Sequence, residues 1–221
     1  DSYAEQIVTR DAVDLGGLRD PSRFRRYLEA VALNTAGMPT DTTLGQAVGA
    51  DRRTIASYEA LMVNLLLLDR VPSWSANRLS RLSKTPKRFV VDSGLAMSLM
   101  RVDEAGVLRD GDALGRLLET FVAAQLRPLL SLSPSRPRLY HLRQGGGDHE
   151  IDLLLEFGGG RVVGIEVKAT STPSLRDARH LLWLQEQIGD RFMVGVVLHT
   201  GLVKRTLATG IHAAPIAALW A

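Results

Sequence analysis

Two carboxylates and a lysine stand on two strand-like runs between residues 150 and 168. The segment reads EIDLLLEFGGGRVVGIEVK, which puts Asp152 on the first run and Glu166 and Lys168 on the second. If the glycines let the two runs pair as a hairpin, side-chain alternation places both acids on one face of the sheet. Crowded carboxylates are stabilised by a nearby cation, and hard oxygen ligands suit Mg²⁺ or Mn²⁺. The expected chemistry is therefore phosphodiester hydrolysis assisted by a divalent metal.

These residues resemble the PD-(D/E)xK motif of restriction-endonuclease-like proteins. Asp152 takes the place of the first acid, Glu166 that of the second and Lys168 that of the lysine, although Ile151 stands where the motif has proline. A further acid often comes from an earlier helix, and Glu119 fits because it lies at the edge of the apolar stripe of GRLLETFVAAQL. The resemblance implies that the three acids hold a metal and that the lysine orients water or stabilises developing charge.

The same spacing has a plainer interpretation. Acids and a lysine also occur by chance on solvated sheet faces, where an exposed ion pair contributes little. The order of elements favours a nuclease-like fold, because a helix carrying Glu119 precedes the strand with Asp152, the hairpin, the strand with Glu166 and a further helix. A fold does not establish an activity. A catalytic domain, a non-catalytic module that binds DNA or protein, and a regulatory platform for an attached ATPase therefore stay open.

The composition is that of a globular chain. Its 221 residues are 45% hydrophobic and 23% charged, which is enough for one large or two small domains. No apolar run reaches the length of a membrane span, and no signal segment opens the chain, so we expect a soluble, cytoplasmic protein without membrane partners. Cysteine is absent, which excludes disulfides and thiolate metal ligands. The chain begins at Asp1 rather than methionine, as expected of a fragment.

The first hundred residues have a helical pattern. Helices are expected from Pro21 to about Gly37, from Asp41 or Thr42 to Gly49, and from the capping residue Asp51 onward. A helix, a short glycine turn and a capped helix are typical of a helix-turn-helix. The strand-like runs LLLLDRV and KRFVV that follow predict the hairpin of a winged helix. We therefore expect a winged-helix-like module at residues 1–105 and a restriction-endonuclease-like mixed-sheet domain at 106–221, giving an α/β (α+β overall) fold.

The winged-helix interpretation predicts a DNA-binding surface. Arg52 and Arg53 would begin the recognition helix, and the basic loop between the strand-like runs would contact phosphates through Arg81, Lys84 and Lys87. The mildly basic net charge of +3 permits this partner without identifying it. Winged helices also serve as protein-docking modules, and a run of arginine and lysine is often only solvated.

Other chemistry has weaker support in the sequence. The pattern GxxxxGK[ST] is missing, so no ATP site is expected in this chain. The five histidines lack the spacing of metal ligands and are interpreted as surface or core residues.

Nearly the whole chain resembles the C-terminal region that follows the ATPase domain in many bacterial and archaeal AAA+-type ATPases. The resemblance rests on YAEQIVTRDA, ASYEALMVNLLLLDRV, KTPKRFVVDSGLA, GRLLETFV, EIDLLLE and IEVKAT, in that order. It implies a winged-helix-like module joined to a restriction-endonuclease-like domain, with an ATPase domain upstream in the intact protein. The activity of that region is not settled by the resemblance.

Overall fold

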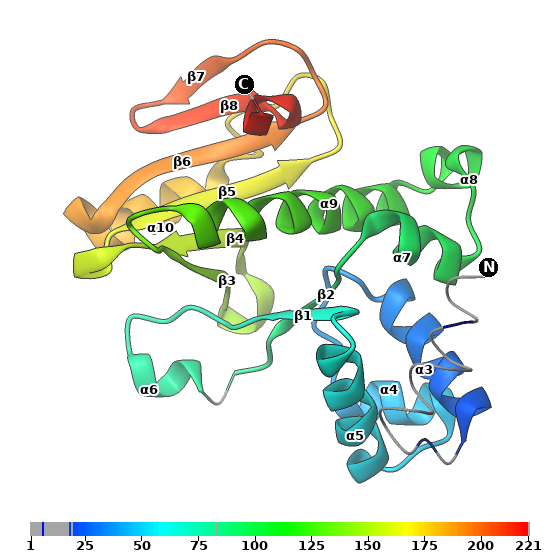
Figure 1. Ribbon diagram of the computed structural model, residues 1–221. Coiled ribbons are helices and arrows are strands. Elements are labelled where there is room, and N and C mark those ends of the chain that lie inside the picture. Colours follow the sequence, from blue (N-terminus) through cyan, green and yellow to red (C-terminus); the bar gives the residue numbers. More distant parts are fainter. Residues whose placement is uncertain (1–5, 7–17, 19, 83, 221) are drawn as a thin grey trace. The chain divides into compact units, whose positions relative to one another are not determined.

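The computed structural model describes residues 6, 18, 20–82 and 84–220, and the chain forms two compact units (Figure 1). Unit 1 comprises residues 1–70 and 87–120, and unit 2 comprises residues 71–86 and 121–221. The N-terminal part is helical and the C-terminal part is rich in sheet, which confirms the expected mixed fold class. The opening segment YAEQIVTRDA lies outside the described residues apart from residue 6.

Unit 1 is built from capped helices. They are α3 (Pro21–Leu33), α4 (Asp41–Val48), α5 (Arg52–Asn64), α7 (Ser93–Met100), α8 (Glu104–Arg109) and the first half of α9 (Gly111–Leu132). Asp51 accepts a hydrogen bond from the Thr54 backbone N–H at the start of α5, and Gly49 ends α4 with φ of 66°. These local signals confirm the helix, glycine turn and capped helix expected from the sequence. The apolar faces of α3, α4 and α5 meet in one core around Phe24, Tyr27 and Ile55.

The two short strands β1 (Leu68–Val71) and β2 (Lys87–Val90) pair in a two-stranded sheet, as the winged-helix pattern predicts. Their connection, which contains α6 (Arg78–Arg81), belongs to unit 2. His141 donates its backbone N–H to the Pro72 carbonyl at 3.0 Å, and the Trp74 N–H donates to the His141 carbonyl at 2.6 Å. The connection therefore lies along the edge of the unit 2 sheet. Each compact unit is thus made of two separate stretches of the chain.

Unit 2 contains a mixed six-stranded sheet with the order β3-β4-β5-β6-β8-β7. Strands β3 (Arg138–Gln144), β4 (His149–Glu156) and β5 (Val162–Lys168) are antiparallel neighbours, and the predicted hairpin of β4 and β5 is confirmed. The chain then crosses through α10 (Arg179–Ile188) to β6 (Phe192–His199), which runs parallel to β5. Strands β7 (Arg205–Ala208) and β8 (Ile211–Pro215) complete the sheet, and short 3₁₀ turns lie at Gly145–Gly147, Gly158–Gly160, Gly189–Arg191 and Ile216–Trp220.

Helix α10 packs against β4, β5 and β6 and buries Leu181 and Leu184 (Figure 1). The helix approaches closely because Gly164 and Gly195 lie beneath it. A Cβ atom at Gly164 would stand 2.6 Å from Leu181 Cδ2, and one at Gly195 would stand 3.2 Å from Leu181 Cβ. The two glycines therefore set the distance between α10 and the sheet. No helix in the described part of the chain has the length and apolar character needed to cross a membrane.

Candidate functional site

Strand β4 is irregular at the residue predicted to be the first acid. Its pairing with β3 shifts register between Tyr140, opposite Leu154, and Leu142, opposite Ile151. Asp152 lies in this interval, and its carboxylate Oδ2 accepts a hydrogen bond from the Val167 backbone N–H of β5 at 2.9 Å. This hydrogen bond from the backbone of β5 holds the Asp152 carboxylate in position.

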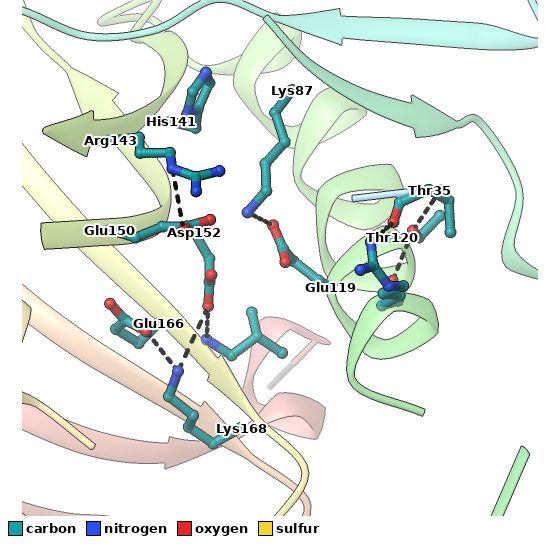
Figure 2. Close-up of polar contacts among 12 residues, drawn as sticks. Thr35, Lys87, Glu119, Thr120, His141, Arg143, Glu150, Asp152, Glu166 and Lys168 are labelled. Atoms are coloured by element: carbon teal, nitrogen blue, oxygen red, sulfur yellow. Dashed lines mark hydrogen bonds and ion pairs between the residues drawn. The ribbon is translucent and has the colours of Figure 1, made fainter. Parts of the chain in front are cut away.

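The structure brings Asp152, Glu166 and Lys168 together at the end of β5 (Figure 2). Lys168 Nζ lies 2.7 Å from Glu166 Oε2 and 4.0 Å from Asp152 Oδ2. The Glu166 side chain is 2% exposed and that of Lys168 is 34% exposed. The ammonium group offsets the repulsion between two carboxylates that burial would otherwise make costly. The lysine keeps one side toward solvent, where a ligand can reach it.

Glu119 has a defined partner within unit 1. Its carboxylate forms an ion pair with Lys87 Nζ, and the Lys87 side chain is 1% exposed (Figure 2). The neighbouring residue Thr120 shares a buried hydroxyl contact of 2.9 Å with Thr35. Glu119 therefore belongs to the polar contacts of unit 1, whereas the set formed by Asp152, Glu166 and Lys168 belongs to unit 2.

The donor set in unit 2 matches one class of metal ion. Among residues 20–82 and 84–220, no group of three or more histidine, cysteine or acidic side chains is arranged to hold a metal. A structural zinc site needs four protein ligands and a catalytic one needs three, so the Asp152 and Glu166 pair does not fit zinc. Mg²⁺ often binds through one or two carboxylates, with water and substrate phosphate completing its shell. The pair fits Mg²⁺ or Mn²⁺ of that kind.

The residues predicted to contact nucleic acid divide into two groups. Arg52 and Arg53 are exposed in the first turn of α5, and Lys84 is exposed in the connection between β1 and β2. Arg52 lies 4.0 Å from Asp41, but 89% of its side chain is exposed. These three cations are placed where a phosphate can reach them.

Arg81 and Lys87, which the sequence also predicts to contact phosphates, are much less exposed. Arg81 makes two hydrogen bonds of 2.7 Å to the Glu156 carboxylate, and its side chain is only 10% exposed. Lys87 is buried against Glu119. Both charges are already paired with acids, Arg81 with Glu156 and Lys87 with Glu119, so a phosphate would have to displace a carboxylate to bind either one. Arg81 and Lys87 are therefore less accessible to nucleic acid than the sequence suggested.

A histidine cluster beside the site had no signal in the sequence. His149 stacks on Trp183 at a centroid distance of 3.9 Å, and its ring meets that of His180 at 5.9 Å. Burial lowers the pKa of His180, and the positive charges of Arg179 and Lys168 lower it further. The two histidines come from β4 and α10, so only the packing of the helix on the sheet brings them together. Spacing along the chain therefore could not reveal this cluster.

We expect His180 to take up its proton below pH 6.5, the ordinary pKa of the side chain. As the pH falls, the unfolded chain binds this proton at a higher pH than the folded chain does. Protonation of His180 therefore lowers the free energy of unfolding as the pH drops below about 6.5. Titration of the ring signals by NMR measures the midpoint. Lys168→Met should raise the pKa of His180 because a nearby positive charge is removed, whereas Lys204→Met should not. An unchanged midpoint in Lys168→Met would show that the two residues are not electrostatically coupled.

Both halves of the chain match families without an assigned role. Residues 1–106 match the family described as Domain of unknown function (DUF8612), and residues 114–219 match the one described as Domain of unknown function (DUF4143). Similar proteins occur in Mycobacterium bovis and Mycobacterium tuberculosis, and each is described as an uncharacterized protein. Each is 30% identical over 175 residues, covering 79% of this chain and 38% of the relative. The chain therefore spans well under half the length of these relatives.

Proposed function

We propose that unit 2 is a divalent-metal-dependent nuclease that hydrolyses phosphodiester bonds in DNA. One observation carries the proposal, namely the contact of Lys168 Nζ with Glu166 at 2.7 Å and with Asp152 at 4.0 Å. Two carboxylates and one cation at a partly open site match the needs of phosphodiester cleavage, in which a metal, a water and a negatively charged phosphate must meet.

The topology supports the same proposal. Helix α9, the antiparallel strands β3, β4 and β5, the crossover helix α10 and the parallel strand β6 follow one another in this order. This order resembles the core of restriction-endonuclease-like proteins. The two acids and the lysine also occupy the hairpin strands on which the PD-(D/E)xK motif of those proteins lies.

Asp152 and Glu166 would hold Mg²⁺ or Mn²⁺, which when bound would lower the pKa of the attacking water and polarise the phosphate. The Val167 N–H keeps the Asp152 carboxylate in place. Lys168, with 34% of its side chain exposed, would orient the attacking water or stabilise the charge that develops on a phosphoryl oxygen. Glu119, which pairs with Lys87 within unit 1, stays the candidate for a further ligand or for water-mediated support of the metal.

The proposal extends to the partners of the chain. Arg52 and Arg53 begin the second helix of a helix-turn-helix and stay exposed, which supports contact with DNA phosphates. The chain covers 38% of the relatives that it matches, and its sequence resembles the region after an AAA+-type ATPase domain. We infer that an upstream ATPase domain acts together with these two units, in the cytoplasm.

Incubation of labelled DNA and RNA with the full chain and Mg²⁺ or Mn²⁺ tests the activity. We expect cleavage of DNA that chelation of the metal stops and that Asp152→Asn lowers by about a hundredfold, because the variant loses a metal ligand. Asp190→Asn is the matched control, since Asp190 is an exposed acid of the same unit outside the site. Equal cleavage by all three proteins would remove Asp152 from the mechanism.

The second candidate function is a non-catalytic DNA- or protein-binding module that regulates the attached ATPase. The exposure of Arg52 and Arg53 favours it, because DNA binding by α5 does not depend on the site in unit 2. Duplex binding that weakens steeply with salt, without cleavage at any metal concentration, would support this function and overturn the nuclease proposal.

A further inference from the structure

A pocket of about 550 Å³ opens at the hairpin end of the unit 2 sheet. Its walls come from the β4–β5 turn, the start of β3 with the residues before it, and the connection after β1, all within unit 2. Strand β5 extends roughly 20 Å from Val162, next to this turn, to Lys168. The pocket is therefore distinct from the site formed by Asp152, Glu166 and Lys168. Its volume is in the range of sites for small ligands.

The pocket has a net positive charge. Arg136 and Arg138 line it, both are exposed, and neither has a carboxylate partner among the residues that the structure describes. A third arginine of the lining, Arg81, is offset by the carboxylate of Glu156. Two uncompensated guanidinium groups thus remain at the pocket. Guanidinium groups bind phosphate oxygens through paired, charge-assisted hydrogen bonds, so an anionic phosphate is the matching ligand group.

The wall behind these arginines is rigid. Glu156 accepts two hydrogen bonds from Arg81 and one of 3.0 Å from the Trp74 indole N–H. The Arg81 guanidinium also lies 5.0 Å from the ring centroid of Tyr140, which faces the pocket with Phe157. Phe157 and the mostly buried Tyr140 thus give the pocket lining an aromatic part beside its arginines. Because the wall is held before any ligand arrives, little ordering is needed on binding.

Glycines keep the pocket open. A Cβ atom added at Gly158 or Gly159 would meet no other atom within 4 Å. Gly159 has φ of 74°, in the left-handed region that favours glycine, whereas Gly158 has no positive φ. Gly158 therefore accepts a side chain without backbone strain. This position provides a way to obstruct the pocket without disturbing the turn.

We propose that this pocket binds a nucleoside 5′-phosphate, with the phosphate on Arg136 and Arg138 and the base against Tyr140 and Phe157. The ligand is either a free nucleotide or the 5′-phosphorylated end of a nucleic acid strand, since both present the same group. The inference does not depend on the nuclease proposal, because it involves none of the residues of that site.

Calorimetric titration of the full chain with ADP and with a 5′-phosphorylated oligonucleotide tests the site. We expect saturable binding of at least one of the two probes, and the one that binds identifies the source of the phosphate. Arg136→Ala and Arg138→Ala should each weaken binding roughly tenfold, as expected for loss of a charge-assisted hydrogen bond. Gly158→Glu should abolish binding because it puts a carboxylate at the pocket. Adenosine should bind far more weakly than ADP.

Two matched control variants distinguish binding in this pocket from binding elsewhere on the chain. Arg161→Ala removes an exposed arginine of the same hairpin that does not line the pocket, and it should bind as the unchanged chain does. Asp152→Asn should also bind normally, whatever its effect on cleavage. Absence of saturable binding of both probes, or equal binding by Gly158→Glu and the unchanged chain with both folded by circular dichroism, would overturn the proposal.

Discussion

Replacing Lys168 by methionine is expected to lower metal-dependent DNA cleavage by about a hundredfold or more while leaving affinity for the cation unchanged or higher. The ammonium group lies 2.7 Å from Glu166 and 4.0 Å from Asp152, so it neutralises the carboxylates that we propose as ligands. Removing it increases the mutual repulsion of the two carboxylates, and a divalent cation relieves that repulsion. Cleavage rates with labelled DNA and calorimetry with Mn²⁺ measure the two effects separately.

The comparison with Glu166→Gln makes this prediction specific. Glu166 is proposed as a ligand, so its amide variant should lose both cation affinity and cleavage. Lys204→Met removes an exposed lysine elsewhere in unit 2 and should change neither quantity. A fall in Mn²⁺ affinity in Lys168→Met equal to that in Glu166→Gln would contradict the separate role of the lysine.

Replacing Arg88 by methionine is expected to destabilise unit 1 by about 3–5 kcal/mol. The Arg88 side chain is 4% exposed and binds the Glu59 carboxylate at 2.6 Å. It also donates to the Pro39 carbonyl at 2.6 Å and to Asp41 at 2.9 Å. Methionine fills similar space but leaves Glu59, itself 9% exposed, with the half-exposed Arg70 at 2.9 Å as its remaining ion-pair partner, and it removes the donor to the Pro39 carbonyl. Unfolding by urea, followed by circular dichroism, measures the loss.

An exposed ion pair of the same unit is the matched control. Arg101 lies 3.3 Å from Glu29, and its side chain is 73% exposed. Arg101→Met should therefore lower the free energy of unfolding by about 1 kcal/mol at most. Similar losses of unfolding free energy in the Arg88 and Arg101 variants would show that the burial of Arg88 does not strengthen its contribution to stability.

Local patterns in the sequence predicted the elements well. The cap at Asp51, the turn at Gly49 and the glycines between β4 and β5 depend on residues close in the chain, so the helix pair and the hairpin could be inferred directly. The same holds for Glu166 and Lys168, which share a face of one strand and contact each other. Strict alternation failed on β4, where Leu153 and Leu154 are both buried, because the sheet is covered on both faces there and the register shifts.

The sequence by itself thus determined the helix caps, the hairpin and the pairing of acids and lysine, because each arises from neighbours along the chain or from the period of a strand. Only the tertiary structure decided that Arg81 and Lys87, part of an apparently basic loop, are buried against Glu156 and Glu119. It alone also assembled the arginine-lined pocket. Residues far apart in sequence form these contacts. The residue type alone does not reveal whether a charged side chain is solvated or paired inside the fold.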